Sequence, residues 1–140
     1  MKYGILIILF VTSCTMKKST TTDSKDFSQL HDIWALTSIE SKTYEIGDSP
    51  KHPTLEINLS ENKVFGNDGC NRFFGGIDSV GYEVLHLGML AGTKMMCQNM
   101  EVADSFGKLL SSTRRYKLQE LQLTLMDEEG KELLTFKKVD

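Results

Sequence analysis

Alternation of apolar and polar residues dominates most of the chain. Residues 55–59 and 121–125 place leucine or isoleucine at every second position, with polar residues between them. A period of two predicts β-strands that bury one face. Trp34 and Leu36 begin a similar alternation that extends toward Ser38. Clusters rich in Asn, Asp, Ser and Gly separate these strands and favour short antiparallel hairpins, at residues 60–62, 67–69, 78–81 and 127–130.

One segment departs from the period of two and has the spacing of a helix. Its apolar residues stand at i, i+4, i+7 and i+8, as on one helix face: Val102, Phe106, Leu109 and Leu110. Asn99 or Asp104 is available to begin the first turns. We therefore predict one amphipathic helix over residues 99–112. Together these patterns predict a mainly β (α+β) fold, with an antiparallel curved sheet or closed barrel and the helix over an open end or face.

The N-terminal residues carry targeting information. Lys2 precedes an apolar run at residues 5–11, and Thr12-Ser13-Cys14 follows it. This run of about seven residues is far shorter than the roughly 20 that a membrane-spanning helix needs, so we expect a cleaved signal peptide over residues 1–13. A cysteine directly after small residues matches the bacterial lipobox, which makes Cys14 the predicted lipid attachment site. The alternative is a cleaved signal with an incidental cysteine.

The residues that follow predict how the protein is held in the cell envelope. Residues 15–26 are rich in Ser, Thr and charge, so we expect a lipidated, flexible tether over residues 14–27. One domain, over residues 28–140, fits the remaining length. Acyl chains on Cys14 would anchor it without a transmembrane helix. Because Thr15 is not acidic, we expect an outer-membrane address facing the periplasm.

Composition and charge exclude some partners. The chain has 16 basic and 19 acidic residues, a net charge of −3, so it offers no basic excess for nucleic acid. Its three histidines occur singly, without the paired spacing of a metal site. We therefore expect no nucleic acid, no cofactor and a monomeric domain, whose partners are the membrane, through its lipid, and another envelope protein.

Residues 65–97 carry the densest set of motifs. Residues 69–73 read GCNRF, with glycines soon after, and residues 93–97 read TKMMC; WAL stands upstream at residues 34–36. In this order the chain resembles the META domain family, also called HslJ-like, over essentially the whole domain. Ile77 and Met96 depart from the aromatic and the smaller residue that relatives often carry there, which concerns packing detail only.

The resemblance implies a fold and a compartment, and no reaction. META domains are similar to small, lipocalin-like β-barrels with a helix, and they occur on secreted or lipid-anchored envelope proteins. Some members are linked to heat stress, antibiotic tolerance or motility. No catalytic residue is established for the family, so none is carried over to this chain.

The cysteines form an even pair once Cys14 is used for lipid. In an oxidising compartment we predict a disulfide between Cys70 and Cys97. It would close a loop of about 27 residues and stabilise the domain by about 3.5 kcal/mol in the chain-entropy model. Two buried, reduced thiols are the competing structural interpretation, and reactive or metal-binding thiols are a third. Mass spectrometry of the non-reduced domain separates these possibilities.

Soft sulfur ligands and a hydrolase triad are the two chemical alternatives to a non-enzymatic module. Thioethers and a thiolate select Cu(I), so the weak metal candidates are Met95, Met96, Cys97 and Met100. The even spacing of Met89 and Met95 is instead typical of core residues that share one strand face. A cysteine hydrolase would combine either thiol of the pair with His86 and Asn71. We predict no metal site and no enzyme.

A polar corner remains as the candidate interaction site. We expect its Asp and Asn side chains to bond turn amides and Arg72 to bond carbonyls. The functional hypothesis is recognition of an anionic group by Asp68, Gly69, Asn71, Arg72, Phe73, Thr93 and Lys94. The predicted function is thus a lipid-anchored, non-enzymatic interaction or envelope-stress module, the alternative being a small-molecule or copper-binding barrel. We expect a barrel of this size to be filled by side chains, including Trp34, Phe65, Phe73, Phe74, Phe106 and Phe136.

Overall fold

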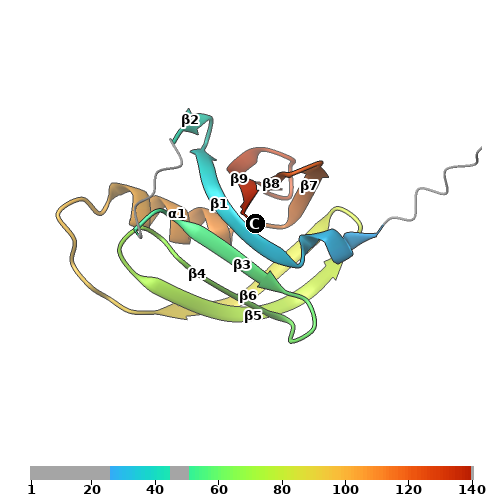
Figure 1. The fold of residues 1–140 in the computed structure, drawn as a ribbon, viewed down its shortest axis with the longest axis horizontal. Coiled ribbons are helices and arrows are strands. Elements are labelled where there is room, and N and C mark those ends of the chain that lie inside the picture. Colours follow the sequence, from blue (N-terminus) through green and yellow to red (C-terminus); the bar gives the residue numbers. More distant parts are fainter. Residues whose placement is uncertain (1–25, 45–50, 140) are drawn as a thin grey trace, which may run out of the picture.

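The computed structural model describes residues 26–44 and 51–139. Within this part the chain forms a short 3-10 helix, nine strands and one α-helix (Figure 1). In order these elements are η1 (Phe27–Leu30), β1 (Asp32–Ile39), β2 (Lys42–Thr43), β3 (Thr54–Asn58), β4 (Lys63–Asn67), β5 (Arg72–Gly81), β6 (Val84–Gly92), α1 (Glu101–Ser111), β7 (Arg115–Gln119), β8 (Gln122–Met126) and β9 (Glu132–Val139).

The strands form a single antiparallel sheet that closes on itself as a ring. Neighbours follow the order β2-β1-β3-β4-β5-β6-β7-β8-β9, and β1 also pairs with β9. The sheet curls so that β4, β5 and β6 lie on one side of the ring and β7, β8 and β9 on the other (Figure 1). The mainly β fold with a curved sheet and one helix is thereby confirmed.

The ring has one narrow junction, between β6 and β7. Only Val84 and Arg115 are partners there, whereas β8 and β9 share five partner pairs. Two backbone bonds flank this pair, from Leu85 N to Arg114 O at 3.1 Å and from Tyr116 N to Glu83 O at 3.2 Å. Burial raises the pKa of the Tyr116 hydroxyl at this junction. The segment that joins the two strands contains α1, so the strand pairing is shortest at the point where the helix interrupts the sheet.

Large apolar side chains fill the interior of the ring. Trp34 is 1% exposed, and its indole Nε1 donates to the Leu30 carbonyl at 3.0 Å, which satisfies its polar atom in the core. Leucine and isoleucine from strands around the ring complete the core, and among the described residues no buried side-chain polar atom lacks a partner. Fully buried neighbours include Leu36, Leu55, Ile57, Leu85, Leu123, Leu125, Leu134 and Phe136.

The helix contributes its apolar face to the same core. Ala103, Phe106 and Leu110 are buried, and the Phe106 ring lies 5.7 Å from that of Phe73 and 6.0 Å from that of Phe136. The helix covers Glu101–Ser111, close to the predicted range of 99–112. The Asn99 side chain accepts a hydrogen bond from Glu101 N at 2.9 Å, one residue before Met100, which is the N-cap of the helix.

The alternation along the strands is confirmed in β3, whereas Ala35 of β1 and Thr124 of β8 are buried although a period of two places them on the outer face. Leu55 and Ile57 are buried while Glu56 is exposed. Leu121 lies in the turn between β7 and β8 and is 53% exposed. Phe74 is 59% exposed on the outside of β5, and its partner Phe65 of β4 faces the same side, so the expectation that these two rings join the core is wrong. Met89 is 92% exposed, because β6 is irregular between the residues that pair with Gly75 and Ile77.

Candidate functional site

The turn between β4 and β5 forms the polar corner. Asp68 Oδ1 accepts hydrogen bonds from Cys70 N at 2.8 Å and Asn71 N at 2.6 Å, and Asp68 N donates to Asn71 O at 3.0 Å. Gly69 has a φ of +95°, a conformation that favours glycine, and an added Cβ would come within 3.3 Å of the Lys51 carbonyl. The predicted role of Asp68 as a partner of turn amides is therefore confirmed.

Asn71 fastens this turn to the segment that follows β6. Its side chain is buried, at 8% exposure, and its Oδ1 accepts from Thr93 Oγ1 at 2.9 Å and from Met95 N at 2.7 Å. Thr93 Oγ1 in turn accepts from Arg72 N at 3.2 Å. A buried amide that bonds both a hydroxyl and a backbone amide fixes the relative position of the two segments.

A disulfide ties the same two segments a second time. Cys70 and Cys97 are bonded, with 6.0 Å between their Cα atoms, which supports the predicted pairing. A disulfide sulfur is not a thiolate, so neither cysteine is available as a nucleophile or as a Cu(I) ligand while the bond is intact. Met89 is 92% exposed and Met95 is 55% exposed, so the expectation that these two share a buried strand face is wrong. Met96 is 89% exposed.

The structure separates the members of the hydrolase alternative. His86 pairs with Ser79 in the β5–β6 ladder, whereas Gly92, six residues further along β6, pairs with Phe73 beside the corner. At about 3.3 Å per residue, His86 lies on the order of 20 Å along the strand from Asn71 and the disulfide. His52 Nε2 contacts Leu36 O at 2.8 Å. In residues 26–44 and 51–139 no group of three His, Cys, Asp or Glu side chains is placed to hold a metal ion.

Two cations of the corner are exposed. Arg72 and Lys94 both have exposed side chains, and within the described part of the chain the Arg72 guanidinium makes no hydrogen bond. The expectation that this guanidinium bonds carbonyls of the corner is therefore wrong for these residues. Phe73 points to the other side of β5, where it packs against Phe106, so it supports the corner from within and is not part of its surface.

Small clefts flank the Gly69 turn on either side. One has a volume of about 180 Å³ and is lined by Lys51, Asn67, Gly69, Cys70, Asn71, Arg72 and Met95. The other, of about 210 Å³, reaches the start of α1 and is lined by Tyr44, Lys51, Pro53, Asp68, Gly69, Asn99, Val102 and Ala103. Lys51 borders both clefts, and sequence reasoning missed it because nothing in the local pattern around residue 51 indicates that it approaches the β4–β5 turn.

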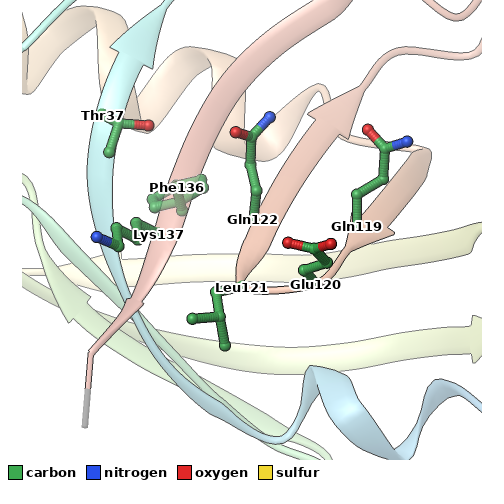
Figure 2. A pocket seen from close by; sticks show the side chains of 7 residues that line it. All are labelled: Thr37, Gln119, Glu120, Leu121, Gln122, Phe136 and Lys137. Carbon is green, nitrogen blue, oxygen red and sulfur yellow. The ribbon is translucent and has the colours of Figure 1, made fainter.

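A wider depression lies elsewhere, on the outside of the ring. Its volume is about 700 Å³, and β1, β9 and the turn between β7 and β8 form its walls (Figure 2). Five of its seven lining residues are polar or charged, with both signs of charge present: Thr37, Gln119, Glu120, Leu121, Gln122, Phe136 and Lys137. Buried leucine and aromatic side chains fill the ring interior, so this depression is not the enclosed apolar cavity that a barrel-interior binder would need.

Fold and corner together define a class of protein: a small ring-shaped β-domain with one core helix and a disulfide-tied turn. The family model described as META domain matches residues 28–140. The chain belongs to the META domain family. The predicted family is thereby confirmed. Among curated proteins, none matches this chain.

Solved structures share this fold. The NMR structure of a protein from Burkholderia xenovorans is 26% identical, with a TM-score of 0.60, and the match covers 79% of this chain and 85% of that one. A second NMR structure gives the same identity and TM-score over 78% and 90% of the two chains. The crystal structure of a DUF4847 family protein from Bacteroides vulgatus ATCC 8482 shares the fold, at 13% identity and a TM-score of 0.53, over 79% and 96% of the two chains.

The described residues contain no helix that is long and apolar enough to cross a membrane. The predicted lipid site at Cys14, the signal peptide at residues 1–13 and most of the tether lie outside those residues.

Proposed function

We propose that this protein is a lipid-anchored, non-enzymatic module of the cell envelope that binds an anionic group of another envelope component through its polar corner. Cys14 carries the lipid, and residues 14–27 tether the domain to the outer membrane on its periplasmic side. A disulfide between Cys70 and Cys97 is consistent with that address, because disulfides persist in oxidising compartments.

The contrast between Asn71 and Arg72 carries the proposal. Asn71 is buried, and its side-chain oxygen accepts two hydrogen bonds within the corner, so it fixes the backbone around Arg72. Arg72 follows it directly, is exposed and directs its donors to no described residue, beside a cleft of about 180 Å³. A guanidinium on a rigid frame binds carboxylate or phosphate in a bidentate manner, and little ordering is needed on binding. Lys94 adds a second exposed cation next to Thr93, whose backbone N–H donates to the Arg72 carbonyl at 3.0 Å.

Photo-cross-linking tests the corner. A photoreactive residue in place of Met95, which is 55% exposed beside the corner, should give a discrete adduct when the protein is irradiated in its native membrane. The pair Arg72→Glu and Lys94→Glu should abolish that adduct. Lys117→Glu, a matched change at an exposed lysine of β7, should leave it intact. An adduct that survives the double change, or is lost equally in all variants, would show that the corner is not the binding site.

Analysis of the mature N-terminus tests the anchor. Mass spectrometry should find an acylated Cys14 as the first residue, and Cys14→Ala should abolish both the acyl group and the cleavage before residue 14. An unmodified Cys14 in membrane-bound protein would refute lipid anchoring while leaving the corner hypothesis open to the cross-linking test.

A further inference from the structure

Large apolar side chains are exposed together on the outside of β4, β5 and β6. Phe65 of β4 pairs with Phe74 of β5, and Phe74 pairs with Ala91 of β6, so the three side chains form one row across the sheet. Phe65 is half-buried, Phe74 is 59% exposed and Ala91 is exposed. Met89 stands beside this row at 92% exposure. We call these four residues the outer apolar face.

The outer apolar face continues toward the polar corner. Arg72 is two residues before Phe74, and a spacing of two places both on the same side of β5. Beyond the end of β6, Lys94 is followed by Met95 and Met96, which are 55% and 89% exposed. Arg72 and Met95 line the same cleft, so the outer apolar face continues into the corner through these two side chains. Single exposed apolar residues are ordinary, but a contiguous group of this size marks an interaction site.

The distribution of charge indicates what this surface binds. Arg72 and Lys94 lie at the corner end, whereas Lys63 of β4 lies at the opposite end and is paired with Glu61 at 3.2 Å. Two carboxylates border the face: Glu56 of β3 is the direct partner of Phe65, and Asp78 lies over Gly88, next to Met89, at the end away from Arg72. A surface with protruding Phe and Met side chains beside Lys and Arg matches the boundary of an anionic bilayer, where apolar groups enter the acyl region and cations meet phosphates.

We propose that the outer apolar face and its two cations dock the domain onto a membrane surface that contains anionic phospholipid. The proposal rests on the proposed function and deepens it, because it names a phospholipid headgroup as the anionic group that Arg72 and Lys94 bind and relies on the lipid on Cys14 to bring the domain to the bilayer. Phe74, Met89, Met95 and Met96 enter the headgroup boundary, and Arg72 and Lys94 contact phosphate. The domain thus lies against the membrane on one defined side.

A tryptophan at position 74 tests this docking directly. The chain has one tryptophan, Trp34, which is 1% exposed and gives a constant background. Phe74→Trp is a conservative change at an exposed site, and Leu121→Trp is its matched control. Leu121 is 53% exposed, and it lies in the turn between β7 and β8, across the ring from β5 (Figure 1). Both variants are made in the mature chain, residues 14–140, with Cys14→Ser, which cannot be lipidated.

Vesicles of phosphatidylcholine, with and without phosphatidylglycerol, provide the two surfaces. With phosphatidylglycerol present, Phe74→Trp should show a blue-shifted emission that brominated lipid quenches, and Leu121→Trp should show neither effect. Arg72→Gln with Lys94→Gln should weaken vesicle binding about 25-fold, roughly five-fold for each cation, and Lys117→Gln should not. Inorganic phosphate at millimolar concentration should not reproduce the emission shift, which separates a lipid surface from a free phosphate.

Three results would overturn the docking proposal. Phe74→Trp could stay unshifted although the protein sediments with the vesicles, or both tryptophans could shift equally. A blue shift that appears without vesicles and grows with protein concentration would assign the face to a second copy of the chain. Because the reporter is position-specific and Cys14 is absent, a failure of lipid anchoring or of cross-linking at the corner leaves this readout unaffected.

Discussion

Removal of the Cys70–Cys97 disulfide should destabilise the domain without changing its native structure. The bond joins residues separated by 27 positions. In the chain-entropy model a loop of that length restricts the unfolded chain by about 3.5 kcal/mol at 25 °C, with most of the effect in the unfolded state. In the native state Asn71 still holds the two segments through Thr93 and Met95, so the corner should keep its geometry without the bond.

Urea denaturation of the wild-type domain and of the Cys70→Ala/Cys97→Ala variant measures this loss. For a domain of this size the urea dependence is about 1.5 kcal/mol per molar, so the midpoint should fall by roughly 2 M. Wild-type protein unfolded with reductant should match the double variant. A loss below about 1 kcal/mol, or two alkylatable thiols in the unreduced domain, would refute the reasoning. A change in the near-ultraviolet spectrum of the folded variant would show that the bond also shapes the native corner.

Three further changes test the core, the corner and a surface ion pair. Phe106→Ala removes the ring that packs between Phe73 and Phe136 and should lower the free energy of unfolding by about 3–5 kcal/mol in urea denaturation. Phe106→Leu keeps most of the apolar volume and should lower it by less than about 1.5 kcal/mol. Asn71→Ala leaves the Met95 amide without its partner and should cost about 2–4 kcal/mol; an unchanged midpoint would deny its framing role. Burial raises the pKa of Asp32. Hydrogen bonds and the charge of Lys138, 2.7 Å away, have the larger combined effect and lower this pKa below its ordinary value of 3.8. The stability from this pair should therefore be present above pH 3.8 and be lost as pH falls through the lowered pKa, and melting temperatures of Asp32→Asn should lack that part of the acid dependence.

Local patterns predicted the elements well and their faces less well. The period of two in residues 55–59 and the helical spacing around Phe106 depend on short-range geometry, and both have the predicted form. The alternation cannot say which set of side chains faces inward. The irregular pairing of β6 moves Met89 outside, and ring closure by β1 and β9 joins residues about a hundred positions apart, which no local pattern reports.

The polar corner likewise has features that the sequence could predict and features that it could not. Asp68 and Asn71 bond atoms close in sequence or in the neighbouring strand, so the turn chemistry of residues 68–71 was enough to anticipate a structural role. Pairing of Cys70 with Cys97 followed from the number of cysteines and the expected compartment. The approach of Lys51 to Gly69 and the exposure of Arg72 depend on how β3, β4 and β5 curl, and only the three-dimensional structure provides that information.

The position of β1 has a mechanical consequence for a tethered domain. β1 begins at Asp32 and is paired on one side with β3 and on the other with β9. A pull from the N-terminal side acts along this strand, and the hydrogen bonds of an antiparallel ladder lie across it, so both ladders bear the load together in shear. β3 and β4 connect β1 to the corner, so force on β1 reaches the corner through these two strands. The junction of β6 and β7, which has a single partner pair, is not part of this connection.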